Sequence, residues 1–206
     1  MIVYMKVLIT GGTGVVGSHA VAAIAGSRHE LRLLVRRPEQ VAASLDPLGV
    51  DVSDVVVGVL DETVVASAVQ GCDAVVHAAA VFSLDSRRAE EMRHTNVRAT
   101  ELVLGQAVAR GLDPVVHVST TVALTRYAGS GPDLPLGDIE LPYVQSKIAS
   151  EEVARRLQDR GDPVVTIYPG PVYGPNDPYR GDRAKCSVGS CAPPLPALAE
   201  GWDARQ

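Results

Sequence analysis

Short apolar runs alternate with longer amphipathic stretches along most of the chain. The runs are rich in Val and Leu and are bounded by turn-forming residues, which is typical of buried strands, whereas the longer stretches have helical spacing. The predicted strands are Met5–Thr10, Glu30–Val35, Asp54–Val59, Ala74–His77, Val115–Ser119 and Val164–Tyr168, and the predicted helices are Gly14–Ala25, Glu62–Gln70, Arg87–Arg110 and Tyr143–Arg160. Strands joined by crossover helices predict an α/β fold, a doubly wound parallel sheet with helices on both faces.

Composition narrows the class of protein. The chain has 206 residues, of which 46% are hydrophobic and 4% aromatic, and this suits one sheet with a core rich in Val, Ala and Leu. It has 19 basic and 24 acidic residues, a net charge of −5, so neither nucleic acid nor an anionic membrane is an expected partner. No apolar run is long enough to span a membrane, and the first residues lack a signal-peptide pattern. We therefore expect a cytoplasmic protein.

The three cysteines add little chemistry. Cys72, Cys186 and Cys191 have neither zinc-ligand nor redox spacing. We predict no metal site, and we interpret the cysteines as unpaired thiols in a reducing compartment.

A glycine-rich segment, TGGTGVVG at residues 10–17, directly follows the first predicted strand and opens the first helix. Such a turn needs glycines for positive φ and for close backbone approach, and the helix N-terminus then offers free N–H groups to a pyrophosphate. The segment predicts a dinucleotide site. A glycine turn that serves packing alone is the alternative.

Two further groups of residues are candidates for the chemistry of a site. Tyr143 and Lys147 are four residues apart on a helix, so they share a face, and the ammonium could stabilise a phenolate for acid/base chemistry. The hydroxyls of Ser119, Thr120 and Thr121 end a strand where a substrate carbonyl would bind. The alternatives are a solvated Tyr/Lys pair and hydroxyls that cap local backbone.

Taken in order, these motifs resemble the short-chain dehydrogenase/reductase superfamily, in particular its extended branch of NAD-dependent epimerases, dehydratases and dihydroflavonol-reductase-like enzymes. The resemblance covers most of the chain. It rests on TGGTGVVG (10–17), GCDAVVHAAA (71–80), TNVRAT (95–100), HVST (117–120), YVQSK (143–147) and PGPVYGP (169–175).

The resemblance implies a Rossmann-type fold and a set of site residues. Tyr143 would be the acid/base, Lys147 would lower its pKa and bind the nicotinamide ribose, and Thr120, in preference to Ser119, would position the substrate. Asn96 would either serve the site or pack and bend the long helix. The implied cofactor-binding residues are Gly11, Thr13, Gly14, Val15, Val16, Gly17, Arg36, Leu60, His77, Ala78, Ala79, Tyr143, Lys147, Pro169 and Val172.

The end of the second predicted strand bears on cofactor choice. Arg36 and Arg37 follow it with no acidic residue, whereas an NAD site needs a carboxylate there for the ribose 2′-hydroxyl. A guanidinium can bind a 2′-phosphate, so we expect NADP(H) in preference to NAD(H), with solvated surface charges as the alternative. The family's Gly-Asp after the third strand is replaced by Gly58-Val59-Leu60-Asp61. Asp61 is then expected to cap the next helix, which leaves recognition of adenine to the backbone near Val59 and Leu60.

The family pattern fades after Pro175. We expect an NAD(P)-binding domain over residues 1–175 and an irregular tail rich in Pro and Gly over residues 176–206, truncated or out of frame, with the substrate lobe largely missing.

Three functions follow from these predictions. The first is a reductase-like oxidoreductase that transfers a hydride between nicotinamide and a carbonyl or secondary alcohol of a small molecule. Nucleotide-sugar epimerases and dehydratases share this step, but no Asp-Glu pair follows Thr120, as would be expected in dehydratase-like members. The others are a non-catalytic NADP(H)-binding regulatory module and an inactive fragment. The resemblance also implies a homodimer through the two long helices, with Val, Ala and Leu on their outer faces.

Overall fold

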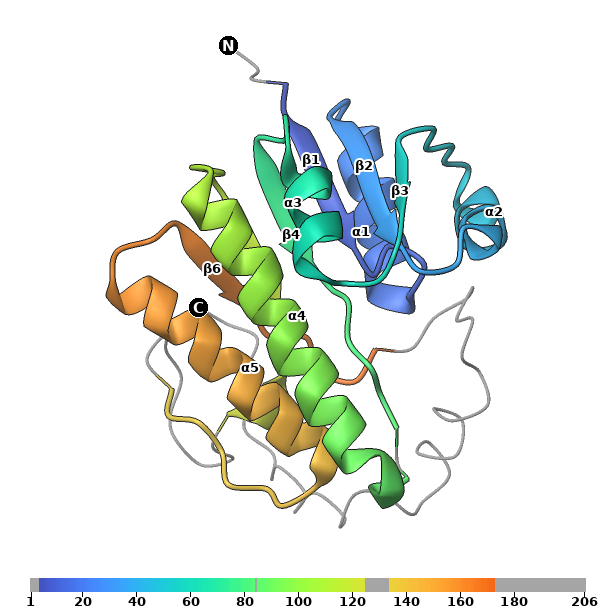
Figure 1. Cartoon of the computed structure of the whole chain (residues 1–206). Coiled ribbons are helices and arrows are strands. Elements are labelled where there is room, and N and C mark those ends of the chain that lie inside the picture. Colours follow the sequence, from blue (N-terminus) through green and yellow to red (C-terminus); the bar gives the residue numbers. More distant parts are fainter. Residues whose placement is uncertain (1–3, 84, 125–133, 173–206) are drawn as a thin grey trace, which may run out of the picture.

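The computed structural model describes residues 4–83, 85–124 and 134–172. Six parallel strands form one sheet in the order β3-β2-β1-β4-β5-β6 (Figure 1). Their bounds are β1 Lys6–Thr10, β2 Glu30–Val35, β3 Val55–Val57, β4 Ala74–His77, β5 Val115–Val118 and β6 Val164–Ile167. This order is that of the Rossmann fold, so the predicted fold class is confirmed.

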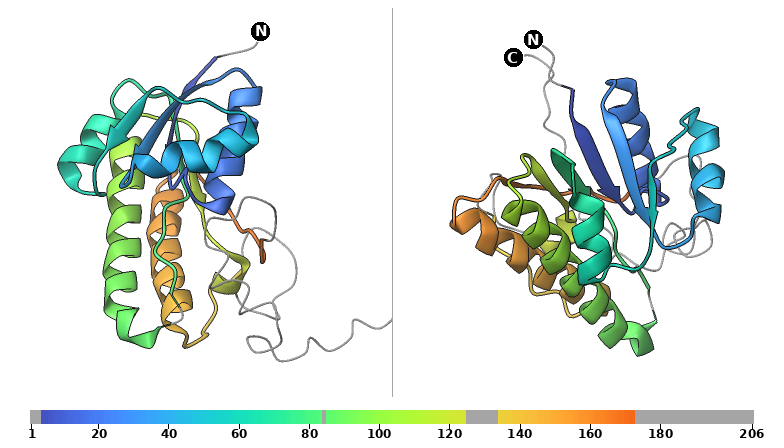
Figure 2. Two further views of the ribbon diagram at one scale, coloured as in Figure 1. Left: turned by 90° about the vertical axis from the view of Figure 1, so that its right-hand side faces the viewer. Right: turned by 45° about the horizontal axis from the view of Figure 1, so that its top comes forward.

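Helices cover both faces of the sheet, and Figure 2 shows α1 and α2 on one face and α3, α4 and α5 on the other. Their bounds are α1 Val15–Gly26, α2 Glu39–Leu45, α3 Glu62–Val69, α4 Ala89–Ala109 and α5 Pro142–Asp159. Short 3₁₀ turns lie at Asp46–Leu48, Ser86–Arg88 and Thr121–Ala123.

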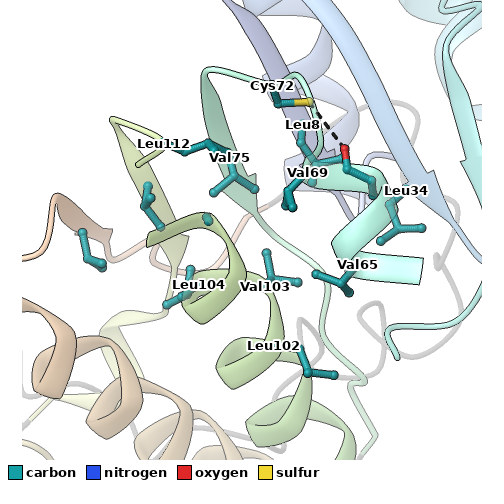
Figure 3. Close-up of a cluster of buried hydrophobic side chains, with 14 of the residues drawn as sticks. Leu8, Leu34, Val65, Val69, Cys72, Val75, Leu102, Val103, Leu104 and Leu112 are labelled. Atoms are coloured by element: carbon teal, nitrogen blue, oxygen red, sulfur yellow. Dashed lines mark hydrogen bonds between the residues drawn. The ribbon is translucent and has the colours of Figure 1, made fainter. Parts of the chain in front are cut away.

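Successive side chains of a strand point to opposite faces of the sheet, so the core has one part on each face. In β1, Leu8 packs with α3, α4 and α5, whereas its neighbours Val7 and Ile9 pack with α1 and α2. Figure 3 shows the first of these clusters, in which Val75 of β4 and Val103 of α4 are fully buried. Both faces of the central strands are therefore buried, which explains why their sequences read as continuous apolar runs.

The structure differs from the prediction in two elements between β2 and α3. Helix α2 was not predicted, because seven residues give too little periodicity; it is held by buried Leu45 and by a hydrogen bond from the Ser44 hydroxyl to the Thr13 carbonyl (3.2 Å). Strand β3 is shorter than predicted. Its continuation stops at Gly58, where a Cβ would meet the Val64 side chain at 2.8 Å.

The long helices α4 and α5 place most of their large apolar side chains toward the sheet. Most of the large apolar side chains of α4 and α5, such as Leu102, Leu104 and Leu157, are buried in the core against the sheet. The groove between the two helices combines charged and apolar side chains with one glycine, namely Glu101, Gly105, Val153, Arg156, Leu157, Asp159 and Arg160.

The chain order changes direction between β1 and β4, which are neighbours in the sheet. At such a switch point the segments after the two strands diverge and leave room for a ligand. Within the described residues, no helix is both long and apolar enough to cross a membrane. The predicted tail over residues 176–206, Cys186, Cys191 and the end of the 169–175 motif lie outside the described residues.

Candidate active site

The turn after β1 touches the segment after β4 at the switch point. Gly11 has a φ of +74°, and a Cβ there would lie 2.6 Å from the Ala79 nitrogen and 2.8 Å from the Ala78 oxygen. Only glycine meets both demands, because it has no Cβ and adopts a positive φ without strain. The predicted residues Gly11, Ala78 and Ala79 are therefore brought together by backbone contact.

The N-terminus of α1 follows directly. A Cβ at Gly17 would overlap the Gly11 carbonyl oxygen, so the helix begins pressed against the turn. Among the described residues, no side chain caps this end at Gly14, and the first turn contains no acidic residue. Free N–H groups and the positive end of the helix dipole are thus left for an anion, and the glycine cradle fits a dinucleotide pyrophosphate. Thr13, Val15 and Val16 belong to the same turn.

His77 is buried at the end of β4, and its side chain serves the fold. Its Nδ1 hydrogen-bonds the Thr10 hydroxyl (2.7 Å) and its Nε2 the Thr100 hydroxyl (3.3 Å). Burial lowers the pKa of His77 to about 3, and the positive charge of Lys147 acts in the same direction, so the imidazole is neutral. His77 thereby fixes the strand end from which Ala78 and Ala79 continue.

Lys147 lies against the carboxyl end of β5. Lys147 is 4% exposed, and its ammonium donates a hydrogen bond to the Val118 carbonyl oxygen (2.9 Å). Burial lowers the pKa of Lys147 to about 8, while the negative charge of Glu151 raises it. The interpretation of Lys147 as a solvated surface residue is wrong, because the helix face that it shares with Tyr143 is turned toward the sheet.

Tyr143 lies in the first turn of α5 and is half-buried. Its ring meets the Phe82 ring edge-on, with centroids 4.8 Å apart. The Ser146 hydroxyl donates to the Tyr143 carbonyl oxygen (2.7 Å) and accepts a hydrogen bond from the Asn96 amide (2.9 Å). Sequence reasoning missed Phe82 and Ser146, because neither has a motif of its own.

Asn96 lies on the buried face of α4 and contacts the segment after β4. Its amide oxygen accepts from the Val81 nitrogen (2.7 Å) and its amide nitrogen donates to the Val81 carbonyl (3.0 Å). Together with the bond to Ser146, these contacts engage the amide oxygen once and the amide nitrogen twice. Asn96 therefore connects the segment after β4 to the first turn of α5.

The hydroxyls after β5 differ in exposure. Ser119 is 5% exposed and its Oγ has no hydrogen-bond partner among the described residues, whereas Thr120 is half-buried. The Thr121 nitrogen donates to the Pro169 carbonyl oxygen (3.1 Å), so the segment after β6 lies beside that after β5. Val172, predicted to line the nicotinamide ring, is in this segment.

The adenine end of the site has two predicted residues. Arg36 follows β2 and is exposed, with no hydrogen bond or ion pair to any described residue. Leu60 is half-buried and packs against the core. Asp61 accepts a hydrogen bond from the Val64 nitrogen (2.9 Å), so the prediction that Asp61 caps α3 is confirmed.

With the site described, comparison with known proteins decides the family. The model of the NAD dependent epimerase/dehydratase family matches residues 7–189. The chain belongs to this family.

Curated proteins of similar sequence include several reductases and dehydrogenases. It is 30% identical over 181 residues to a 4-hydroxy-2-methyl-3-oxo-4-farnesyl-3,4-dihydroquinoline-1-oxide ketoreductase of Stigmatella aurantiaca, covering 84% of this chain and 52% of that protein. It is 30% identical over 177 residues to a protein of Synechocystis sp. provisionally named dihydroflavonol 4-reductase, covering 82% and 50%. The chain thus spans about half the length of the curated relatives it matches.

Two solved structures with bound NAD share the fold. The dTDP-glucose 4,6-dehydratase DesIV of Streptomyces venezuelae with bound NAD is 32% identical, with a TM-score of 0.69, covering 84% of this chain and 58% of that one. A short-chain dehydrogenase/reductase superfamily protein of Agrobacterium tumefaciens with bound NAD is 28% identical, with a TM-score of 0.63, covering 79% and 48%.

Proposed function

We propose that the chain is the cofactor-binding part of an NAD(P)-dependent reductase that acts on a carbonyl or secondary alcohol of a small molecule. The observation that carries this proposal is a glycine cradle at the switch point, combined with a buried lysine one helical turn from Tyr143. The ketoreductase and the other reductase-named relatives support the reaction class. The free, buried Cys72 supports a reducing, cytoplasmic compartment.

The residues have separate tasks in this proposal. The turn at Gly11 and Gly17 and the N-terminus of α1 would hold the pyrophosphate, and the bound nicotinamide would supply or accept the hydride. Tyr143 would move the proton to or from the substrate oxygen, and the charge of Lys147 would make its phenol acidic enough to do so. Thr120 would hold the substrate oxygen, supported by its exposure at the strand end; buried Ser119 is the less accessible hydroxyl.

We further propose that the cofactor is NADP(H). Arg36 is exposed and forms no hydrogen bond or salt bridge with the described residues, although its charge acts on Glu91, and it follows the strand whose end approaches the adenosine ribose in this fold. A guanidinium there favours a 2′-phosphate over a hydroxyl. The solved relatives contain NAD, so NAD(H) is the competing cofactor.

Calorimetric titration of the chain with NADPH and with NADH tests both proposals. We expect tighter binding of NADPH, and we expect Arg36→Ala to weaken NADPH selectively, whereas the exposed neighbour Arg37→Ala should change little. Equal weakening of the two cofactors by Arg36→Ala would mean that this arginine does not contact the 2′-phosphate. A folded chain that binds neither cofactor would overturn the proposed function.

A nucleotide-sugar dehydratase or epimerase is the second candidate, because the dehydratase DesIV is 32% identical. Its hydride step would use the same Tyr143 and Lys147. The absence of an Asp-Glu pair after Thr120 in the sequence favours the reductase. Incubation of the chain with a carbonyl substrate panel and NADPH, set beside nucleotide sugars and NAD, distinguishes the two by which mixture turns over.

A further inference from the structure

A cluster of buried polar side chains lies next to Lys147, between α5 and the ends of β5 and β6. Its centre is Glu151, which is 0% exposed. Glu151 Oε1 accepts hydrogen bonds from the Tyr168 hydroxyl and from Arg155 Nε (3.4 Å). Glu151 Oε2 has no hydrogen-bond partner among the described residues, and it lies 3.8 Å from His117 Nε2.

A carboxylate in this position is costly for the fold. Removing a charge from water costs free energy that a well-packed apolar side chain would not require. Helix α5 has apolar residues at other core positions, such as Ala154 and Leu157, so a hydrophobic residue at position 151 would suit the packing. Arg155, which is partly exposed, compensates part of this charge at Oε1, but Oε2 has no hydrogen-bond partner among the described residues. The buried carboxylate therefore calls for a role outside core packing.

The nearby charge of Lys147 suggests this role. Glu151 lies four residues after Lys147 on the same buried face of α5, and both side chains are at least nine-tenths buried. We propose that Glu151 is a positioning residue of the Tyr143–Lys147 pair: its carboxylate is the counter-charge that keeps the buried Lys147 protonated, with its ammonium held at the Val118 carbonyl.

The other titratable groups around Lys147 leave this task to Glu151. His77 from β4 and His117 from β5 are neutral, because burial lowers the pKa of both. Arg155 from α5 is positive, and Tyr168 after β6 is a hydrogen-bond donor to Glu151. Among the buried residues of the described chain, Glu151 is the only acidic one.

Helix α4 contributes uncharged side chains on this side of the site, Asn96 and Thr100. The negative charge of Glu151 thus opposes the effect of burial on Lys147, in agreement with the direction in which it moves the pKa of that lysine. A charged Lys147 is what the chemistry of Tyr143 requires. The inference rests on the proposed function for the use of that charge, but the charge itself can be measured without cofactor or substrate.

The test is a pH titration of Lys147 by carbon-13 NMR in the cofactor-free chain. The sequence contains three lysines, Lys6, Lys147 and Lys185, so a lysine-labelled chain gives a simple spectrum that Lys147→Met assigns. We expect Lys147 to be charged at pH 7. In Glu151→Gln we expect the ammonium to lose its proton at least about tenfold more readily. Glu152→Gln is the matched control, because Glu152 is exposed on the same helix.

Glu151→Asp separates charge from packing, since it keeps the carboxylate while shortening the side chain. We expect Lys147 in this variant to titrate closer to the wild type than in Glu151→Gln. Equal effects of the Asp and Gln variants, or an unchanged titration in a folded Glu151→Gln, would overturn the inference. If the Gln variant does not fold, a wild-type Lys147 that is neutral at pH 7 would overturn it as well.

Cofactor titration of the same samples keeps the two proposals apart. We expect NADPH affinity to fall with rising pH, and to do so at lower pH in Glu151→Gln than in the wild type. A wild-type chain that binds no cofactor but whose Lys147 depends on Glu151 would refute the proposed function and leave the inference intact. Cofactor binding by a chain whose Lys147 titration does not depend on Glu151 would refute the inference and leave the proposed function intact.

Discussion

Gly11 shows how a single residue can determine whether the site exists. Its positive φ and its direct contact with the Ala78 and Ala79 backbone both exclude a side chain, so the glycine motif has a geometric cause here. The motif could be predicted from sequence, because the turn from strand to helix is local. The resemblance also implied Ala78 and Ala79 as site residues, but their direct contact with Gly11 could not be predicted, because the two segments are far apart in the chain.

We expect Gly11→Ala to lower the free energy of unfolding by about 1–3 kcal/mol, since the new Cβ meets backbone atoms and the positive φ becomes strained. Urea unfolding measures this loss. Gly26→Ala is the control, because a Cβ at Gly26 meets nothing within 4 Å. Equal stability of the two variants would contradict the close approach at the switch point.

Tyr143 carries the proposed proton transfer by its hydroxyl alone. We expect Tyr143→Phe to abolish turnover while NADPH affinity stays within about a few-fold, because the ring packing against Phe82 is kept and only the acid/base group is removed. Steady-state kinetics and calorimetry on the same sample test this. Tyr4→Phe, at an exposed position, should behave as the wild type. Loss of turnover and affinity together in Tyr143→Phe would refute the assigned role.

At the scale of elements, Asn96 connects α4 to α5 through its hydrogen bond with Ser146. Helix α4 was predicted from its periodicity, whereas the task of Asn96 was left open between function and packing. The structure shows it paired with the Val81 backbone and Ser146, which fixes the segment after β4 relative to α5. A side-chain amide can pair with a backbone N–H and a backbone carbonyl at once. It can therefore replace the hydrogen bonds that the segment after β4 no longer makes within the sheet.

We expect Asn96→Ala to destabilise the chain by about 2–4 kcal/mol, because it leaves the Val81 N–H and carbonyl without partners. Thermal unfolding measures the loss, and faster hydrogen exchange at the Val81 amide would locate it. Arg98→Ala on the exposed side of α4 is the control; it removes a surface pair with Glu101 and should cost under about 0.5 kcal/mol. An unchanged Val81 exchange rate would contradict the proposed connection.

At the scale of the whole molecule, two neutral histidines are buried at the centre of the sheet. The rings of His77 and His117 stack with centroids 5.9 Å apart, and the pKa of each is lowered by burial. The unfolded chain binds protons at these sites near pH 6.5, where the folded chain does not. Above pH 6.5 both histidines are neutral in the folded and the unfolded chain, and the fold keeps its full stability. As the pH falls from 6.5 toward about 3, the pKa of His77, the unfolded chain binds protons that the folded chain does not, and stability is lost.

We accordingly expect stability to decrease on acidification from pH 6.5, by up to about 1.4 kcal/mol per pH unit for each histidine. Urea midpoints measured from pH 7.5 to pH 4 test this expectation. The decrease should be shallower in His77→Asn than in the wild type and unchanged in His94→Asn, because His94 is exposed. Identical slopes in all three proteins would contradict neutral burial of His77.

We also propose that two copies pair through the groove between α4 and α5. This groove contains acidic and basic side chains and the small Gly105, which permit close approach and charge pairing between two copies. We expect sedimentation of the wild type as a dimer and of Gly105→Arg as a monomer. Gly26→Arg on α1 should leave the dimer intact. A monomeric wild type would refute the proposal.

The sequence by itself determined the strand order along the chain, the fold class, the glycine turn and the Tyr143–Lys147 spacing. Each of these depends on local periodicity or on the conformational demands of one turn, which neighbouring residues specify. Only the tertiary structure decided that Lys147 and Glu151 are buried, that His77 serves the core and that Asn96 joins two segments. These properties depend on contacts between distant parts of the chain, because burial and hydrogen-bond partners exist only once the helices pack on the sheet.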